Sequence, residues 1–114
     1  MSREKFSPAI ISDLPQADIP IEGITSYLLQ GEQQQVVFMS YDEDVSIPEH
    51  SHEAQWGVVL KGEGELTIGG KVHTLRKGDT YFIPSGVPHS ARAKVGFTDV
   101  TLFNQKDRYS ILPE

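Results

Sequence analysis

The chain has 114 residues, four histidines and no cysteine. This length fits one domain, and the lack of cysteine excludes disulfide scaffolds, iron–sulfur clusters, thiolate zinc sites and thiol nucleophiles. The formal charge of −6 opposes binding to a nucleic-acid backbone. Because the chain has no cysteine, nitrogen and oxygen atoms must hold any metal.

The location and partners follow from the same composition. The first residues are too polar for a signal peptide, and the apolar runs are too short to span a membrane. We therefore expect a cytoplasmic protein whose partner is a small-molecule ligand, with neither nucleic acid nor a membrane among its partners.

Residues 1–35 form an N-terminal segment of mixed character. Pro8, Pro15 and Pro20 are expected to break any helix there, and part of 19–29 is a candidate strand. From residue 36 onward, short apolar runs alternate with turn residues, which indicates antiparallel strands. These runs are residues 36–41, 55–61, 65–68, 71–75, 80–83, 90–95 and 97–103.

Two further features of the pattern favour an all-β fold. The pair Gly69 and Gly70 separates two of the runs and predicts a tight hairpin, because both central positions of a type I′ turn need positive φ. No sustained 3.6-residue apolar period is present. Many short strands without helices predict a β-sandwich or a β-barrel.

The histidines suggest a metal site. His50 and His52 occupy positions i and i+2, so on a strand both side chains project from one face. His89 follows a proline-rich turn, and an antiparallel barrel can bring its strand beside the first pair. Neutral imidazole is a common ligand for transition metals. An isolated pair of this kind is more often an exposed pair near a turn, so the second segment decides between the two interpretations.

Two segments together resemble the cupin superfamily of small β-barrels. Gly78 to His89 matches the pattern Gly-x5-Pro-x-Gly-x2-His at every named position. The family's other motif has His-x-His, then a glutamate, and then a glycine after six further residues; here Gln55 and Gly62 follow the histidine pair. The resemblance spans residues 48–93 and implies a double-stranded β-helix, or jelly-roll barrel, of antiparallel strands. We assign residues 36–114 to this barrel.

The resemblance also implies a ligand set. One divalent transition metal ion (Zn, Ni, Mn, Fe or Cu) would be bound by His50, His52, Gln55 and His89. Glutamine replaces the family's glutamate, so the ion keeps its full charge and is a stronger Lewis acid. The gap after His52 is also shorter than usual, which leaves Glu53 as an alternative ligand, although on a continuing strand it would point to the opposite face.

Strand alternation suggests which side chains line a pocket. If His89 faces inward, then Ala91, Ala93 and Val95 do as well. Phe97, Asp99, Thr101 and Phe103 share one face of the last long strand. His73 is expected at the surface, and Trp56 in the core or at a dimer interface.

The C-terminal pattern resembles the single-domain cupins of pectin and uronate breakdown, which open cyclic unsaturated uronates to their keto form. That group uses a glutamine ligand, with an aspartate, a phenylalanine and an arginine near the metal. Phe103 and Arg108 match the last two, but Thr101 occupies the aspartate position, and Asp99 is the nearest acid on that face. The resemblance therefore makes Arg108 the carboxylate partner and Asp99 the proton carrier.

The leading hypothesis is thus a metal-dependent enzyme acting on a small anionic metabolite such as a sugar acid, with isomerase or lyase-like chemistry. A metal-dependent dioxygenase and a non-enzymatic ligand-binding cupin are the alternatives. The alternative for Arg108 is a surface cation paired with Asp107 or Glu114. The family resemblance also implies a homodimer that exchanges an N-terminal strand; the other possibility is that residues 1–35 fold back over their own barrel.

Overall fold

The computed structural model describes residue 6 and residues 8–113, and within them it is almost entirely β-structure. One helical turn, α1 (Ala9–Ser12), precedes the strands. The strands are β1 (Ile24–Gln30), β2 (Gln35–Tyr41), β3 (Val45–His50), β4 (Gln55–Lys61), β5 (Glu63–Ile68), β6 (Lys71–Arg76), β7 (Thr80–Ile83), β8 (His89–Ala93) and β9 (Thr98–Phe103).

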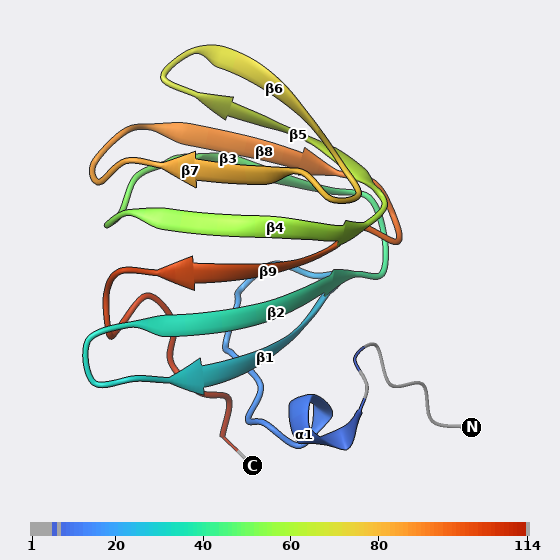
Figure 1. Cartoon of the computed structure of the whole chain (residues 1–114), viewed down its shortest axis with the longest axis vertical. Helices are drawn as coiled ribbons and strands as arrows, with labels where there is room; N and C mark the ends of the chain where they lie inside the picture. The colour runs from blue at the N-terminus through green and yellow to red at the C-terminus, as the bar shows by residue number, and fades with distance from the viewer. Residues whose placement is uncertain (1–5, 7, 114) are drawn as a thin grey trace.

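The strands form two antiparallel sheets. The larger sheet has the order β1-β2-β9-β4-β7, and the smaller one has the order β3-β8-β5-β6. Figure 1 shows the succession β1, β2, β9 and β4, with β5 and β6 at the far end from α1. Apart from the hairpin pairs β1–β2 and β5–β6, neighbouring strands are far apart in the sequence, so residues from both ends of the chain meet in one sheet.

The core lies between the two sheets. Successive side chains of a strand point to opposite faces, and in β2 the side chains of Val37, Met39 and Tyr41 are buried in the core. The same buried cluster contains Leu66 of β5 and Leu75 of β6 from the smaller sheet. The all-β antiparallel prediction is therefore confirmed.

The hairpin between β5 and β6 also forms where the glycine pair predicts it. Gly69 and Gly70 have φ values of 54° and 85°, a region that residues with a Cβ adopt only with strain. Ile68 pairs directly with Lys71 across this turn.

Two expectations about individual residues are wrong. Pro8 and Pro15 do not prevent a helix but flank its single turn, since Pro8 takes the N-cap position. Val95 is 61% exposed, because β8 ends at Ala93 and the alternation ends with it. Trp56 is 44% exposed and is not part of the core, so of its two expected places only the dimer interface stays a prediction.

The N-terminal segment is attached to the barrel of its own chain. β1 pairs with β2 along its full length, from Ile24 opposite Tyr41 to Gln30 opposite Gln35. Strand exchange across a dimer and the boundary at residue 35 stay predictions. Among the described residues, no helix has the length and apolarity needed to cross a membrane.

Candidate metal centre

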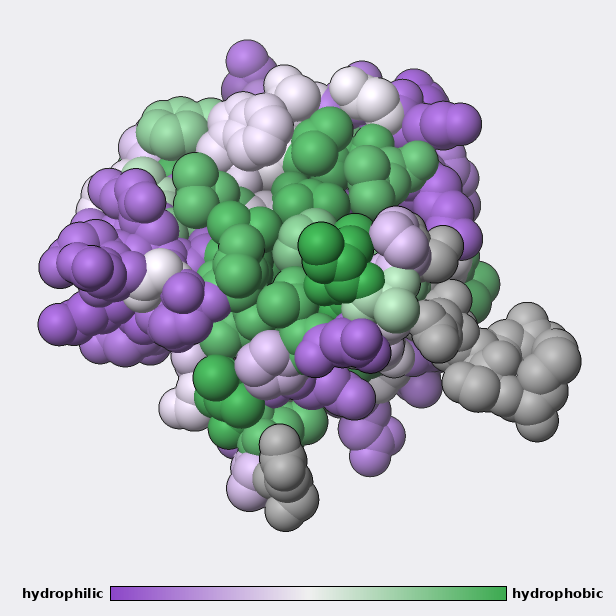
Figure 2. Space-filling view, turned by 60° about the horizontal axis from the view of Figure 1, so that its bottom comes forward, coloured by the Kyte–Doolittle hydropathy of each residue, from purple (hydrophilic) through white to green (hydrophobic). Residues whose placement is uncertain are grey.

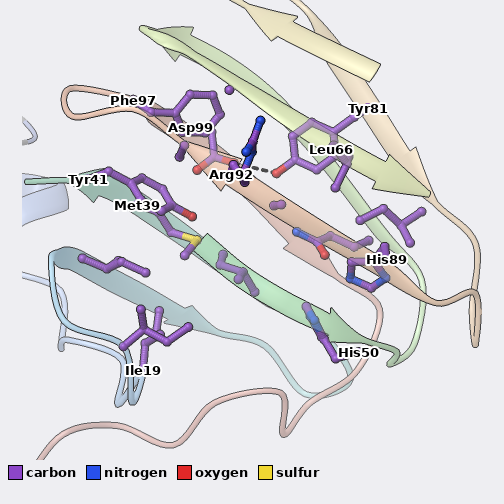
Figure 3. A pocket seen from close by; sticks show the side chains of 18 of the residues that line it. Ile19, Met39, Tyr41, His50, Leu66, Tyr81, His89, Arg92, Phe97 and Asp99 are labelled. Atoms are coloured by element: carbon purple, nitrogen blue, oxygen red, sulfur yellow. Dashed lines mark hydrogen bonds between the residues drawn. The ribbon is translucent and has the colours of Figure 1, made fainter. Parts of the chain in front are cut away.

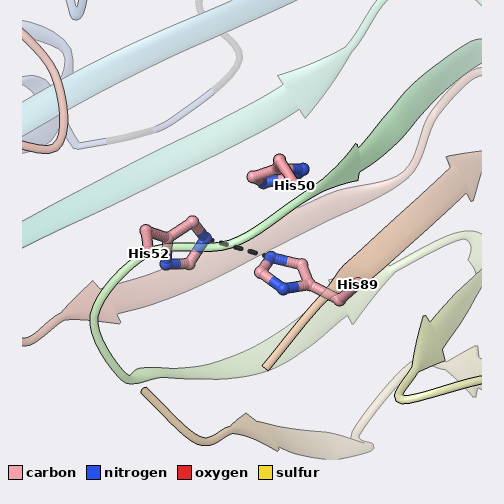
Figure 4. Close-up of side chains that lie close together, drawn as sticks. All are labelled: His50, His52 and His89. Atoms are coloured by element: carbon pink, nitrogen blue, oxygen red, sulfur yellow. Dashed lines mark hydrogen bonds between the residues drawn. The ribbon is translucent and has the colours of Figure 1, made fainter. Parts of the chain in front are cut away.

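Three histidines from separate segments meet at one end of the barrel. His50 ends β3, His89 begins β8, and the two residues pair directly across these strands. His52 follows in the loop before β4. Figure 4 shows the three imidazoles close together, and their ring centroids are 4.3 to 5.2 Å apart. The strand pairing thus assembles the cluster that the spacing of the histidines suggested.

Each ring is oriented by a backbone carbonyl. The Nδ1 atoms of His50, His52 and His89 lie 2.8, 2.7 and 2.9 Å from the carbonyl oxygens of Pro48, Glu53 and Val87. A carbonyl oxygen only accepts, so each Nδ1 carries the proton. In a neutral imidazole this leaves the Nε2 lone pair free to bind a metal, which is the usual supporting arrangement for a histidine ligand.

Electrostatics keeps two of these rings neutral. Burial lowers the pKa of His52 to about 4 and also lowers the pKa of His89, and the nearby positive charge of Arg108 acts in the same direction on both. The Nε2 atoms of His52 and His89 are 3.0 Å apart. The possible ligand atoms of the three histidines all lie within 4.8 Å of one another. This donor set fits a transition metal ion.

Gln55 lies at the start of β4 and also faces the cavity. Its Nε2 donates a hydrogen bond to Thr101 Oγ1 at 2.8 Å, and the Thr101 hydroxyl donates to the carbonyl of Trp56 at 3.1 Å. Because the amide nitrogen is held in this way, Oε1 is the Gln55 atom available to a metal. Nothing in the sequence motif points to Thr101 in this supporting role.

Glu53 points elsewhere. Its Oε1 accepts a hydrogen bond from Ser85 Oγ at 2.7 Å, and its side chain is not among those that line the cavity. His73 lies on β6, outside the cluster. The geometry therefore favours Gln55 over Glu53 as the fourth donor.

A cavity of about 360 Å³ opens between the sheets behind the histidines. Figure 3 shows side chains from several strands pointing into it, with His50 and His89 toward one end and Asp99 toward the other. Most of its wall is apolar, which is usual for a small-molecule site. The apolar lining includes Ile19, Ile21, Ile24, Met39, Ile47, Leu66, Leu75, Ile83, Ala91, Phe97 and Phe103.

Asp99 is a buried carboxyl group in this wall, with only 4% of its surface exposed. The Tyr81 hydroxyl donates a hydrogen bond to Asp99 Oδ2 at 2.5 Å, whereas Oδ1 is buried without a partner in the part of the chain that the structure describes. Burial raises the pKa of Asp99 to about 7, and the hydrogen bond from Tyr81 partly opposes this shift. Asp99 is thus able to exchange a proton near neutral pH.

Tyr81 reaches Asp99 across an intervening strand. β4 lies between β7 and β9, and Gly57 of β4 pairs with both Tyr81 and Thr101. A Cβ on Gly57 would lie 2.2 Å from Tyr81 Cζ, so only glycine leaves room for the ring. Neither histidine motif assigns a role to Tyr81; the signal for it in the sequence is a glycine, Gly57, inside an apolar strand.

Arg108 follows β9 and lines the cavity. Its guanidinium carbon lies 4.4 Å from the ring centroid of Tyr109 and 5.6 Å from that of Phe103, which in turn packs edge-on against His52. Its Nε is buried without a partner among the described residues, which show no ion pair between Arg108 and Asp107. Glu114, the other predicted partner, lies outside the described residues. The cation is therefore held beside the histidines.

These features agree with the comparison to known families. Residues 37–101 match the model of the Cupin domain family. The chain therefore belongs to the cupin family, as its two motifs suggested.

Solved structures show the same fold. An RmlC-like cupin from Shewanella frigidimarina matches with a TM-score of 0.73 and 23% identity over 93% of this chain and 94% of that chain. KdgF from a Halomonas species matches with a TM-score of 0.70 and 24% identity over 81% and 88% of the two chains. Oxalate decarboxylase from Bacillus subtilis, studied for its Mn(II) centres, matches with a TM-score of 0.72 and 23% identity. This match covers 90% of the present chain but only 31% of the decarboxylase. No curated protein sequence matches the chain.

Proposed function

We propose that the protein is a metal-dependent enzyme that acts on a small carboxylate by isomerase or lyase-like chemistry. The observation that carries this proposal is the convergence on one cavity of three carbonyl-oriented histidines and an arginine whose buried Nε has no partner among the described residues. His50, His52 and His89, with Gln55 Oε1 as the fourth donor, would hold one Zn, Ni, Mn, Fe or Cu ion. The Mn(II) centres of the decarboxylase, which has the same fold, support a metal in such a barrel.

The arginine supplies the recognition of the anion. When bound, the metal would act as a Lewis acid that polarises a substrate oxygen. Arg108 would pair with the substrate carboxylate, because its guanidinium lines the same cavity and has a buried nitrogen without a partner in the part of the chain that the structure describes. The rings of Phe103 and Tyr109 hold the guanidinium in place from the side.

Asp99 would transfer the proton that an isomerisation or elimination requires. Its carboxyl group changes charge near pH 7, and Tyr81 fixes one of its oxygens. Asp99 lies on β9 two residues before Thr101, the residue that holds Gln55. The proton would therefore be exchanged at a substrate atom that lies deeper in the barrel than the atom at the metal.

The test begins with elemental analysis of the purified protein, followed by turnover assays on a panel of small carboxylates. We expect metal-dependent turnover that persists without oxygen and that falls at least about tenfold in Arg108→Ala, the loss of one charge-assisted hydrogen bond. Full activity of Arg108→Ala would refute the role of the arginine. Strict oxygen dependence would indicate a dioxygenase, and metal binding without turnover would indicate a ligand-binding cupin.

We further propose a homodimer. Paired residues form an apolar row across the outer face of the larger sheet, from Leu29 through Val36, Leu102 and Trp56 to Phe82. Leu29, Trp56 and Phe82 are 49%, 44% and 56% exposed. Figure 2 shows apolar side chains gathered on one face of the molecule. Such a patch is typical of an interface, and analytical ultracentrifugation tests it.

A cytoplasmic location remains part of the proposal. The chain has no cysteine and thus no disulfide that would need an oxidising compartment. Cell fractionation tests this location.

A further inference from the structure

The two ends of the cavity differ in the polarity of the side chains that line them. At the outer end lie the three histidines, Gln55 and Arg108, which together favour an anion and a metal. Beyond them the wall consists mainly of aliphatic and aromatic side chains from both sheets, together with Ile19 and Ile21 from the segment before β1. A ligand whose charged group is held at the outer end must therefore place its body against apolar atoms.

Few hydrogen-bonding groups interrupt this apolar wall. Asp99 Oδ1 is buried and without a partner among the described residues, and the Tyr41 hydroxyl points into the cavity beside it in Figure 3. Glu65 and Arg92 also contribute to the lining, but they bond to each other at 2.8 Å, and their side chains are 43% and 72% exposed. The inner end thus offers one local cluster of polar atoms.

The spacing of the two ends follows from β9. Phe103 packs against His52 at the outer end, and Asp99 lies four residues earlier on the same buried face of the strand. At about 3.3 Å per residue, their Cα atoms are about 13 Å apart. This length of strand, with a cavity of about 360 Å³, leaves room for a ligand with one aromatic ring or a short chain between its two polar groups.

The Asp99 oxygen that faces a ligand is selected by its neighbours. Tyr81 occupies Oδ2, and the missing side chain of Gly57 allows the tyrosine ring to lie across β4. When the carboxyl group is ionised, Oδ1 is therefore left as a fixed acceptor. A buried acceptor without a partner destabilises the ligand-free site, so a ligand that donates a hydrogen bond there gains affinity.

We propose that the substrate is a carboxylate with an apolar body and one hydroxyl group at its far end. This inference rests on the proposed function. The carboxylate binds at the metal and Arg108, and the hydroxyl donates to Asp99 Oδ1. A sugar acid fits less well, because its several hydroxyl groups would lie against aliphatic side chains without partners.

The experiment measures the binding of three probes to the protein saturated with Zn²⁺, by isothermal titration calorimetry at pH 8.5. The first probe is 3-phenylpropanoate, the second is 3-(4-hydroxyphenyl)propanoate, and the third is galacturonate. We expect the second probe to bind about tenfold more tightly than the first, the ratio that corresponds to one buried hydrogen bond. Galacturonate should bind more weakly than either.

A pair of matched variants locates the hydroxyl. Asp99→Asn keeps the shape of the side chain but can place an amide nitrogen where the free acceptor was, and we expect it to reduce the tenfold ratio to about twofold or less. Asp13→Asn makes the same chemical change at an exposed site outside the cavity and should leave the ratio unchanged. Arg108→Ala should weaken both phenyl probes equally.

The possible failures are distinguishable. Equal affinity for the two phenyl probes, or an unchanged ratio in Asp99→Asn, would overturn this inference and leave the anion site in place. Tighter binding of galacturonate than of either phenyl probe would overturn it in favour of a sugar acid. If no probe binds, or if Arg108→Ala binds as well as the unaltered protein, the carboxylate site of the proposed function fails too.

Discussion

The Nε2 atoms of His52 and His89 lie 3.0 Å apart, and the Nδ1 atom of each ring bonds to a backbone carbonyl. Because both Nδ1 atoms carry protons, two neutral rings would direct two lone pairs at each other. The lowered pKa values of both rings disfavour a proton as the bridge. A bound cation would remove this repulsion, which supports the proposal that this cluster binds a metal.

Metal binding should therefore depend on His52. We expect His52→Ala to weaken metal affinity by at least about 100-fold, since a ligand is lost and not merely a supporting group, whose loss typically costs 10- to 100-fold. A metal at 100 times its dissociation constant stabilises a fold by about 2.7 kcal/mol. Thermal denaturation with and without the ion should show this gain in the unaltered protein and not in the variant.

His73→Ala is the matched control for that measurement. His73 lies on β6, away from the cluster, so its removal should leave the metal-dependent gain intact. An equal loss in both histidine variants would point to binding somewhere other than the proposed centre.

Gln55→Glu should change metal affinity and stability in opposite directions. A glutamate cannot donate to Thr101, so the Thr101 hydroxyl must turn toward the carboxylate and give up the Trp56 carbonyl. We expect a loss of about 1 kcal/mol in the metal-free protein. With metal present, the added negative charge should tighten binding. Urea denaturation in chelator and calorimetric titration of the ion measure the two effects; unchanged metal affinity would argue against Gln55 as a donor.

Gly57→Ala should destabilise the fold through Tyr81. The new Cβ would lie 2.2 Å from Tyr81 Cζ, so the ring must move and its hydrogen bond to Asp99 must weaken. Overpacking of this kind typically costs about 1–3 kcal/mol. Urea denaturation of Gly57→Ala, measured alone and in a Tyr81→Ala background, separates this contact from other effects. A cost that stays the same without the tyrosine ring would show that the clash is not the cause.

The parts of the fold and of the site that follow from local geometry could be predicted from the sequence. The glycine pair determines the β5–β6 hairpin through its positive φ values. The two histidine segments carry the family's spacing, and the direct pairing of His50 with His89 brings them together. In both cases the sequence signal, a glycine pair or a histidine motif, lies within a few residues of the chain.

The contacts that the sequence did not reveal depend on the order of the strands. Tyr81 and Asp99 stand on β7 and β9, which are separated by β4, so their hydrogen bond requires both registers and the gap at Gly57. Val95 shows the opposite limit: the alternation was extended two residues past the end of β8 at Ala93, where the chain turns toward Gly96 with a φ of 93°. Alternation holds only while a strand lasts.

The raised pKa of Asp99 predicts how stability changes with pH. Well below the ordinary pKa of 3.8 the carboxyl group is protonated in both the folded and the unfolded chain. As the pH rises toward 7, the unfolded chain loses this proton while the folded chain keeps it, so the carboxyl group destabilises the fold progressively. The shift from 3.8 to about 7 corresponds to as much as about 4 kcal/mol. Asp99→Asn cannot titrate and should therefore gain stability relative to the unaltered protein between pH 4 and 7, with the difference levelling off above pH 7. Urea denaturation of both metal-free proteins across this range measures the difference, and a difference independent of pH would show that Asp99 is ionised at its ordinary pKa.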